Sequence, residues 1–428
     1  MKRFLLFLAG LSMLLACNIN KNLNKNQMEP YNFEKSWEKI ASLEDQGLYK
    51  SANLVAEEIF QAAKSGKHTL ELIKSLLYRA KYTSELEEDG FINALNLFEQ
   101  ELAQAGQPEK SILQSILAEL YDGYLMQNLW RINQRKAPLD NAQTDIREWA
   151  AQQFVAKSTS LYLASLTDRS SSQLPLKNLG ELIIPGQNRR IDQNNLYELL
   201  ADRAMDYFRQ DKYFLPKSAD SYVMKEEQLF AESKTFTQIN LDAANDSNEK
   251  QVLLILQALT KNYLESGEKD KLAETEIQRM IFLYQNWKGN DAQKIYLKAL
   301  YNITETFAEH EECAEAWYLI ASNLYHNQSA EMSDYTQKGK TIREAHKICV
   351  QTIEKYPGSL GADQCKSLRS QIESKSMGLD VEQVNLPDEN IISLVNYKNI
   401  SKIYLKIVAF DRKAYEKIET LKQKEIDS

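Results

Sequence analysis

The sequence predicts a mainly α-helical protein, in which an array of helix pairs is followed by the start of an incomplete β-domain. Three observations support this class. Apolar residues recur at helical spacing through most of the chain. Glycine, or a Pro-Gly corner, closes successive apolar stripes. From Ile391 to Phe410 the apolar residues instead alternate with a period of two, which is typical of strands.

The composition excludes several functions for this chain. Of its 428 residues, 43% are hydrophobic and 26% are charged, and the net charge is -8. An acidic surface lacks the basic footprint that sequence-independent nucleic-acid binding requires, so we expect no nucleic-acid partner. With only 14 Gly and 8 Pro, the chain also has little material for a glycine-rich phosphate loop.

The first residues form a targeting signal. Met1-Lys2-Arg3 is basic, Phe4 to Leu15 is apolar but too short to span a bilayer, and Leu14-Leu15-Ala16-Cys17 follows. This pattern resembles the signal of bacterial lipoproteins, which implies that residues 1–16 are removed and that the Cys17 thiol is acylated. The alternative is an ordinary secreted protein whose first mature residue is a cysteine. By the same resemblance, Asn18 after the cysteine favours the periplasmic face of the outer membrane.

A polar tether and a helical domain follow the signal. Residues 17–30 are rich in Asn and Lys and predict a flexible segment. Residues 31–375 carry the helical stripes, and equivalent helices start about 35 to 40 residues apart, which is the period of tetratricopeptide-like repeats. Residues 167–195 and 214–237 are irregular and predict ordered loops. The last helix pair meets at the corner Pro357-Gly358-Ser359.

Residues 386–428 predict the beginning of a β-domain. Residues 391–397 and 403–409 are expected to pair as a hairpin-like set of strands across the polar turn Lys398 to Ser401. Two strands alone are marginal in water, so we expect their edges and one apolar face to stay uncovered.

The residues support no enzymatic chemistry. The four histidines lack a metal-ligand spacing, and His310-Glu311-Glu312-Cys313 is better explained as a junction between two helices, because a metal needs three or four convergent ligands. Catalytic serine, dinucleotide and phosphate-loop motifs do not occur. We therefore expect no metal, no cofactor and no catalytic residue. The five tryptophans, spread over different helices, are expected to lie in the core.

Several stretches, taken in order, carry a further resemblance: residues 37–43 (WEKIASL), 47–52 (GLYKSA), 73–78 (IKSLLY), 117–121 (LAELY), 196–204 (LYELLADRA), 356–365 (YPGSLGADQC) and 395–400 (VNYKNI). They are similar to the N-terminal region of the large alpha-2-macroglobulin family proteins of Bacteroidetes. The last stretch looks like the opening of the first macroglobulin-like β-domain.

The resemblance implies a periplasmic lipoprotein that entraps proteases when a bait segment is cut. Many relatives add a thioester built from a Cys-x-Glu-Gln motif. This chain departs from that pattern, because its four cysteines are followed by Asn-Ile-Asn, Ala-Glu-Ala, Val-Gln-Thr and Lys-Ser-Leu. We therefore expect a truncated or split family member that keeps the membrane anchor and the helical mount, with proteases or another envelope protein as partners.

Two alternatives remain open. One is a glycan-binding outer-membrane lipoprotein of the starch-utilisation type, which also combines a lipid anchor with helix pairs. The other is a tetratricopeptide-like scaffold whose concave surface holds an envelope protein.

A disulfide between Cys349 and Cys365 is a further expectation. Each cysteine lies eight residues from Pro357, so two antiparallel helices joined at that corner would bring them to similar depth. The periplasm is oxidising, which permits such a bond. The alternative is a pair of small buried thiols.

The lipid anchor yields a direct prediction. Replacing Cys17 by Ser removes the thiol that would be acylated, so Cys17→Ser should move the protein from the membrane fraction to the soluble fraction. Fractionation of cells followed by immunoblotting measures this. An unchanged membrane fraction would show that another feature holds the protein there.

Overall fold

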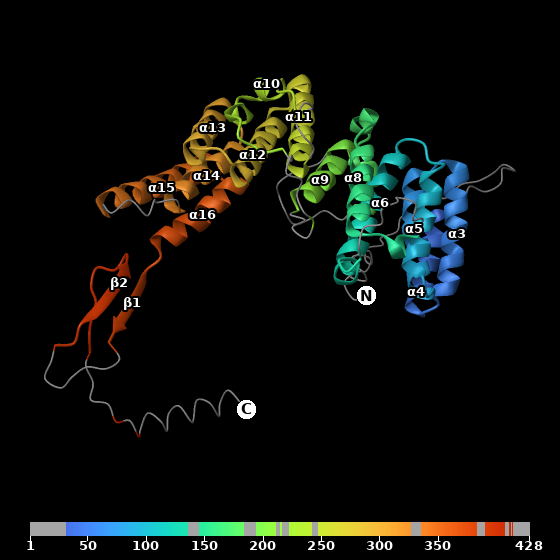
Figure 1. Cartoon of the computed structure of the whole chain (residues 1–428), viewed down its shortest axis with the longest axis horizontal. Coiled ribbons are helices and arrows are strands. Elements are labelled where there is room, and N and C mark those ends of the chain that lie inside the picture. Colours follow the sequence, from blue (N-terminus) through green and yellow to red (C-terminus); the bar gives the residue numbers. More distant parts are fainter. Residues whose placement is uncertain are drawn as a thin grey trace, which may run out of the picture. The chain divides into compact units, whose positions relative to one another are not determined.

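The computed structural model describes residues 31–135, 145–183, 194–210, 215, 222–241, 247–326, 335–382, 390–406, 411 and 413. The expected signal and tether, with Cys17, lie outside the described residues. The described part is mainly helical and ends in a small two-stranded sheet, which confirms the coarse fold class (Figure 1). Within it, every helix is too short or too polar to cross a bilayer.

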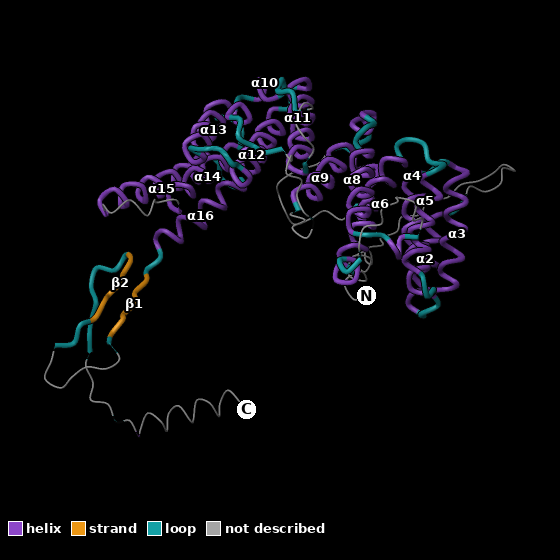
Figure 2. Tube along the Cα trace, viewed as in Figure 1, coloured by secondary structure: helices purple, strands orange, loops and turns teal. Residues whose placement is uncertain are grey.

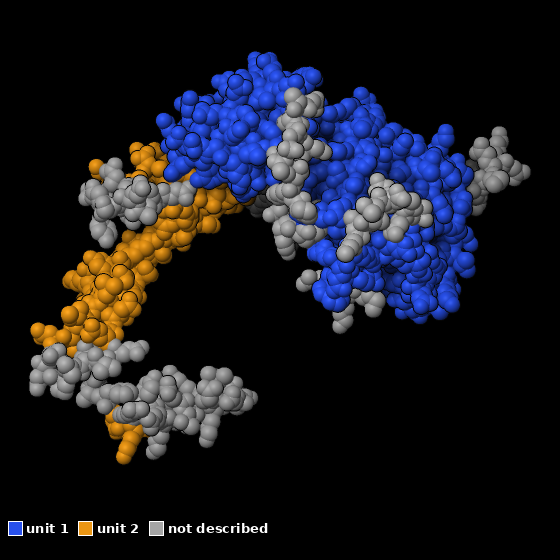
Figure 3. Space-filling model, in the orientation of Figure 1, with its two compact units in different colours: residues 1–310 blue, residues 311–428 orange. Residues whose placement is uncertain are grey.

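The chain divides into two compact units, Met1–His310 and Glu311–Ser428 (Figure 3). The first part of unit 1 consists of consecutive helices: α2 (Phe33–Asp45), α3 (Tyr49–Gly66), α4 (Thr69–Leu86), α5 (Gly90–Leu102), α6 (Glu109–Gln127), α7 (Leu129–Ile132), the 3-10 helix η1 (Ile146–Glu148) and α8 (Ala151–Ser165). Helices α2 to α6 each pack against the next helix in the chain, and α6 packs against α8.

The rest of unit 1 contains more irregular segments. Its elements are η2 (Arg169–Gln173), η3 (Leu176–Leu182), α9 (Leu196–Arg209), η4 (Glu227–Phe230), α10 (Ser233–Phe236), α11 (Asn248–Ser266), α12 (Lys269–Asn286) and α13 (Ala292–Thr306). The two segments expected to be ordered loops therefore contain short helices as well. Residues 184–193 and parts of 211–221 lie outside the described residues.

Local sequence signals explain where many helices begin and end. Asn32 caps α2 by accepting a hydrogen bond from the Lys35 amide at 3.0 Å. The left-handed Gly47 follows α2, and Gly267 ends α11 in the same conformation. Helix α3 ends at Gly66, and the left-handed residue that follows it is Lys67.

One buried arginine holds the irregular segment 222–241 against α12. The Arg279 guanidinium pairs with Glu276 and donates to the Leu229 carbonyl and, at 2.7 Å, to the Ala231 carbonyl. It also lies 4.2 Å from the ring centre of Phe236. The charge is thus fully partnered although its side chain is buried, which is the condition under which a buried cation is tolerated.

Unit 2 begins with three helices, α14 (Cys313–His326), α15 (Tyr335–Lys355) and α16 (Leu360–Glu373), which all pack against one another. Gly358 adopts φ +89° at the corner, and the Ser359 side chain caps α16. The expected helix corner is therefore present. Gly361 permits the closest approach, because a Cβ at this position would lie 2.1 Å from the carbonyl carbon of Ala314 in α14.

The sheet pairs differently from the sequence expectation. Strand β1 (Ser376–Val381) follows α16 directly and pairs antiparallel with β2 (Ser393–Lys398), with Ser376 opposite Lys398 (Figure 2). The expected strand at 391–397 is thus close to β2, but its partner lies before it. Residues 403–406 of the expected second strand form no strand, and residues 407–410 lie outside the described residues. Met377, Leu379 and Val381 alternate with Ser376, Gly378 and Asp380, a short pattern that follows the helical stripe of α16 without a break.

The expectation that all tryptophans lie in the core is wrong for one of them. Trp287 is buried, and Trp37, Trp149 and Trp317 are half-buried. Trp130 is 81% exposed, because it lies on the four-residue helix α7, where Ile132 takes the buried position. Helical spacing does not identify the inward side of so short a helix.

The close approach at Gly361 gives a stability prediction. Gly361→Ala places a methyl group inside the backbone of α14, and we expect a loss of about 1–3 kcal/mol or more, the range for overpacked cores. Gly123→Ala is the matched control, because Gly123 lies within α6 with open space around its Cβ position and should gain about 0.5–1 kcal/mol. Urea denaturation followed by circular dichroism measures both. Equal stability of the two variants would contradict the packing described here.

Candidate functional site

The base of the two-stranded sheet is attached to the helices of unit 2 by polar contacts. The last carbonyl groups of a helix have no partner within the helix, and those of α16 receive donors from the last residue of β2 and the residue after it. Lys398 Nζ donates to the Gln371 carbonyl oxygen at 2.6 Å and to the Tyr325 hydroxyl of α14 at 3.0 Å. A cation at a helix C-terminus also interacts favourably with the helix dipole.

Asn399 continues this cap. Its side-chain Nδ2 donates to the carbonyl oxygens of Ile372, at 2.7 Å, and Ser374, at 3.1 Å. The backbone of Asn399 is left-handed, with φ 55°, a conformation that asparagine tolerates better than most residues. Together, Lys398 and Asn399 bind three carbonyl groups at the α16 terminus, those of Gln371, Ile372 and Ser374, and we call Lys398 and Asn399 the α16 cap.

The faces of the sheet remain open beyond this base. Every residue of β1 is exposed, and in β2 only Val395 and Lys398 are partly covered. Exposed large apolar side chains are concentrated on the two strands (Met377, Leu379, Val381, Leu394 and Tyr397) and on residues that flank β2 in the chain (Ile391, Ile392, Tyr404 and Leu405). The α16 cap therefore holds an uncovered apolar sheet on the end of a helical unit.

A shallow open pocket adjoins the cap. It is lined by Ile342, Arg343, His346, Ile372, Glu373 and Asn399. His346 Nε2 and Glu373 Oε1 lie 2.7 Å apart, and this hydrogen bond lowers the pKa of the exposed Glu373 carboxyl. The pocket combines this histidine–carboxylate pair with two isoleucines and the Arg343 side chain.

The cysteines expected to pair lie together in unit 2. Cys349 comes from α15 and Cys365 from α16, these two helices pack against each other, and both cysteines are buried. Both are thiols in this structure, as is Cys313. The disulfide between Cys349 and Cys365 stays a prediction. Cys17, the expected acylation site, lies outside the described residues.

A second polar cluster surrounds Glu198 in unit 1. The Glu198 carboxylate accepts from Lys271 Nζ at 2.8 Å, from the Asn194 amide at 2.8 Å and from Asn195 Nδ2 at 3.0 Å. Both side chains of the ion pair are largely buried. Burial, followed by the charge of Glu198, raises the pKa of the Tyr263 phenol. This cluster joins the start of α9 to α11 and α12.

The geometry around Glu198 favours a structural role. The adjoining cavity, lined in part by Asp202, Thr275 and Gln278, has a volume of about 10 Å³, which accommodates no more than a water molecule. A small-molecule pocket is tens of times larger. The carboxylate oxygens are already used by three donors, so neither a substrate nor a metal has room to bind.

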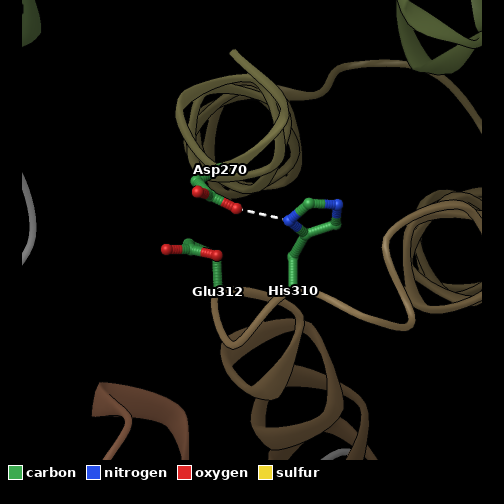
Figure 4. A group of neighbouring side chains, drawn as sticks. All are labelled: Asp270, His310 and Glu312. Carbon is green, nitrogen blue, oxygen red and sulfur yellow. Dashed lines mark hydrogen bonds and ion pairs between the residues drawn. The ribbon is translucent and has the colours of Figure 1, made fainter.

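His310, considered above as a metal ligand, forms an ion pair within unit 1. Its Nδ1 atom contacts the Asp270 carboxylate at the start of α12 (Figure 4). Glu312, also drawn in Figure 4, belongs to unit 2, beyond the boundary at His310.

The contacts around Glu198 have a signal in the local sequence, whereas the α16 cap does not. Asn195 caps α9, because its Oδ1 accepts from the Glu198 amide at 3.0 Å, and the Glu198 carboxylate in turn accepts from the amide of Asn194, the residue before the cap. Lys398 and Asn399 were assigned to a turn on their residue types. Their role as a helix cap depends on the pairing of β1 with β2, which local sequence does not reveal.

Comparison with known proteins found no matching family model and no matching curated protein.

The buried ion pair can be tested by substitution. Lys271→Met leaves the Glu198 carboxylate buried without its cation, and we expect a loss of about 3–5 kcal/mol in unfolding free energy. The double variant Glu198→Gln, Lys271→Met removes the stranded charge and should recover a large part of that loss. Chemical denaturation measures all three proteins. A double variant no more stable than Lys271→Met would contradict a role for the charge.

Proposed function

We propose that this chain is a lipid-anchored, non-enzymatic mount that carries a β-module at the C-terminal end of its helical body. The observation that carries the proposal is the α16 cap, since it fixes the base of an uncovered sheet on packed helices. The proposed setting is the periplasmic face of the outer membrane, reached through the lipidated Cys17.

The proposed system is protease entrapment of the alpha-2-macroglobulin type. This part of the proposal rests on the resemblance of the stretches between Trp37 and Ile400 to proteins of that family. In this scheme the chain supplies the anchor and the helical region. Inhibition itself would require a bait segment and, in many relatives, a thioester, so a partner that carries β-domains would provide them. Exposed apolar strands at the end of unit 2 are consistent with such a partner, because a sheet edge recruits further strands.

The glycan-binding alternative receives less support from the described residues. A sugar platform needs several aromatic rings exposed together. Trp130 is exposed, but the largest group of exposed apolar residues lies on the sheet and is mostly aliphatic. The scaffold alternative overlaps with the proposal and differs in the surface that binds the partner, which would be the helical array.

Site-specific photo-crosslinking tests the proposal. A photoreactive amino acid replaces Leu394, which is 60% exposed on β2, in cells that produce the full chain. We expect cross-links to a polypeptide with macroglobulin-type β-domains or to a protease inhibitor, identified by mass spectrometry. If the partner binds to the sheet, the backbone of the partner should lie close to Leu394.

The matched control carries the same amino acid at Leu54, which is 69% exposed on α3. It should not cross-link to that partner. A partner captured at Leu54 and not at Leu394 would favour the scaffold alternative. Cross-links at Leu394 only to proteins without β-domains, or saturable binding of an envelope polysaccharide to the purified chain, would contradict the proposed mount.

A further inference from the structure

The open pocket beside the α16 cap contains a positively charged side chain that has no acidic partner. The pocket has a volume of about 340 Å³. Small-molecule sites have volumes of about 300–1,000 Å³, so a small ligand would fit here. Arg343 lines the pocket and is exposed on α15, and among the described residues no carboxylate pairs with it. Its guanidinium is therefore available to bind an anionic ligand.

Gly339 leaves space around the Arg343 guanidinium. It lies one helical turn before Arg343 on α15, and a Cβ at this position would lie 3.4 Å from a terminal nitrogen of the arginine. A larger side chain at residue 339 would press on the guanidinium. The planar guanidinium presents its N–H donors as a fork that matches the two oxygens of a carboxylate.

The acidic residue of the pocket already has partners. Glu373 Oε1 lies 2.7 Å from His346 Nε2 and 3.7 Å from Arg369 Nε. Counting the lining residues and Arg369, positive charge is in excess here, although the net charge of the chain is -8. A singly charged carboxylate is favoured in such a pocket, whereas Glu373 would repel a doubly charged phosphate more strongly.

Two isoleucines give the pocket an apolar wall. Ile342 comes from α15 and Ile372 from α16, and both line the pocket. Asn399 also lines it, and the hydrogen bond from its Nδ2 to the Ile372 carbonyl oxygen, at 2.7 Å, fixes this part of the lining. An aliphatic group next to the carboxylate of a ligand would lose its contact with water against these side chains, which favours binding.

We propose that this pocket binds a carboxylate that carries a branched aliphatic group. Arg343 binds the carboxylate, and Ile342 and Ile372 contact the aliphatic group. Two kinds of ligand share this chemistry: a polypeptide whose C-terminal residue is Val, Leu or Ile, and a free branched-chain carboxylic acid. The exposed apolar side chains of the two strands are not part of the lining, so binding here does not depend on the partner proposed for the sheet.

Saturation-transfer NMR with the full chain tests the proposal. The probes are the acetylated peptide Gly-Val-Ile with a free C-terminal carboxylate, the same peptide with a C-terminal amide, and isovalerate. We expect the methyl signals of at least one of the two acids to show saturable binding, with a Kd below about 1 mM. The amide should bind about tenfold more weakly than the peptide acid, because it has no charge to pair with Arg343.

The same titrations distinguish the two kinds of ligand. Binding of both acids supports the C-terminus of a polypeptide as the ligand, and binding of isovalerate alone supports a free acid. No saturable binding of either acid, or equal binding of the peptide acid and its amide, would overturn the proposal. Displacement of the bound acid by an equal concentration of inorganic phosphate would show a general anion site, and this too would overturn it.

Two variants test the role of Arg343. Arg343→Gln removes the charged donors, so the Kd of the bound acid should rise about tenfold or more. Lys347→Gln is the matched control, because it removes one positive charge from an exposed position of the same helix outside the pocket, and its Kd should not change. Circular dichroism establishes that both variants are folded. An unchanged Kd for Arg343→Gln, or equal losses in the two variants, would overturn the proposed site.

Discussion

The unsatisfied carbonyl groups at the end of α16 are the constraint on which the C-terminal part of this protein depends. The last carbonyl oxygens of a helix have no hydrogen-bond donors within that helix. Here Lys398 and Asn399 supply the donors, each to a carbonyl group 27 residues earlier in the chain. The cap therefore closes a loop that contains both strands, and it fixes the base of the sheet at the end of α16.

Polar contacts position the segments of this fold that bury little apolar surface. The strands bury little of their apolar surface, so backbone pairing and the cap must position them. In unit 1, Glu198 and Arg279 join irregular segments to helices in the same manner, each with several partners at close range. Cores of Ala, Leu and Ile then stabilise the helix pairs, and the polar anchors specify the junctions between them.

Much of the helical fold could be predicted from the sequence, because apolar spacing and terminal signals act locally. Stripes such as that of α3, and the corner at Gly358, correspond to the observed elements. The sheet could be predicted only in part. Strand β2 falls within the stretch that was expected to form strands, whereas β1, which is also six residues long, comes directly after the helical stripe of α16, so local residues did not identify it as the partner of β2. The α16 cap and the pairing of Lys271 with Glu198 depend on long-range contacts, which periodicity does not encode.

The α16 cap holds the sheet on the helices of unit 2, and amide hydrogen exchange tests this claim most directly. In the double variant Lys398→Ala, Asn399→Ala, the amides of β1 and β2 should lose protection, while those of α14 and α15 keep theirs. Lys402→Ala is the control, because this exposed lysine lies just beyond the cap and should leave exchange unchanged. Strand amides that remain as protected in the double variant as in the original protein would contradict the account.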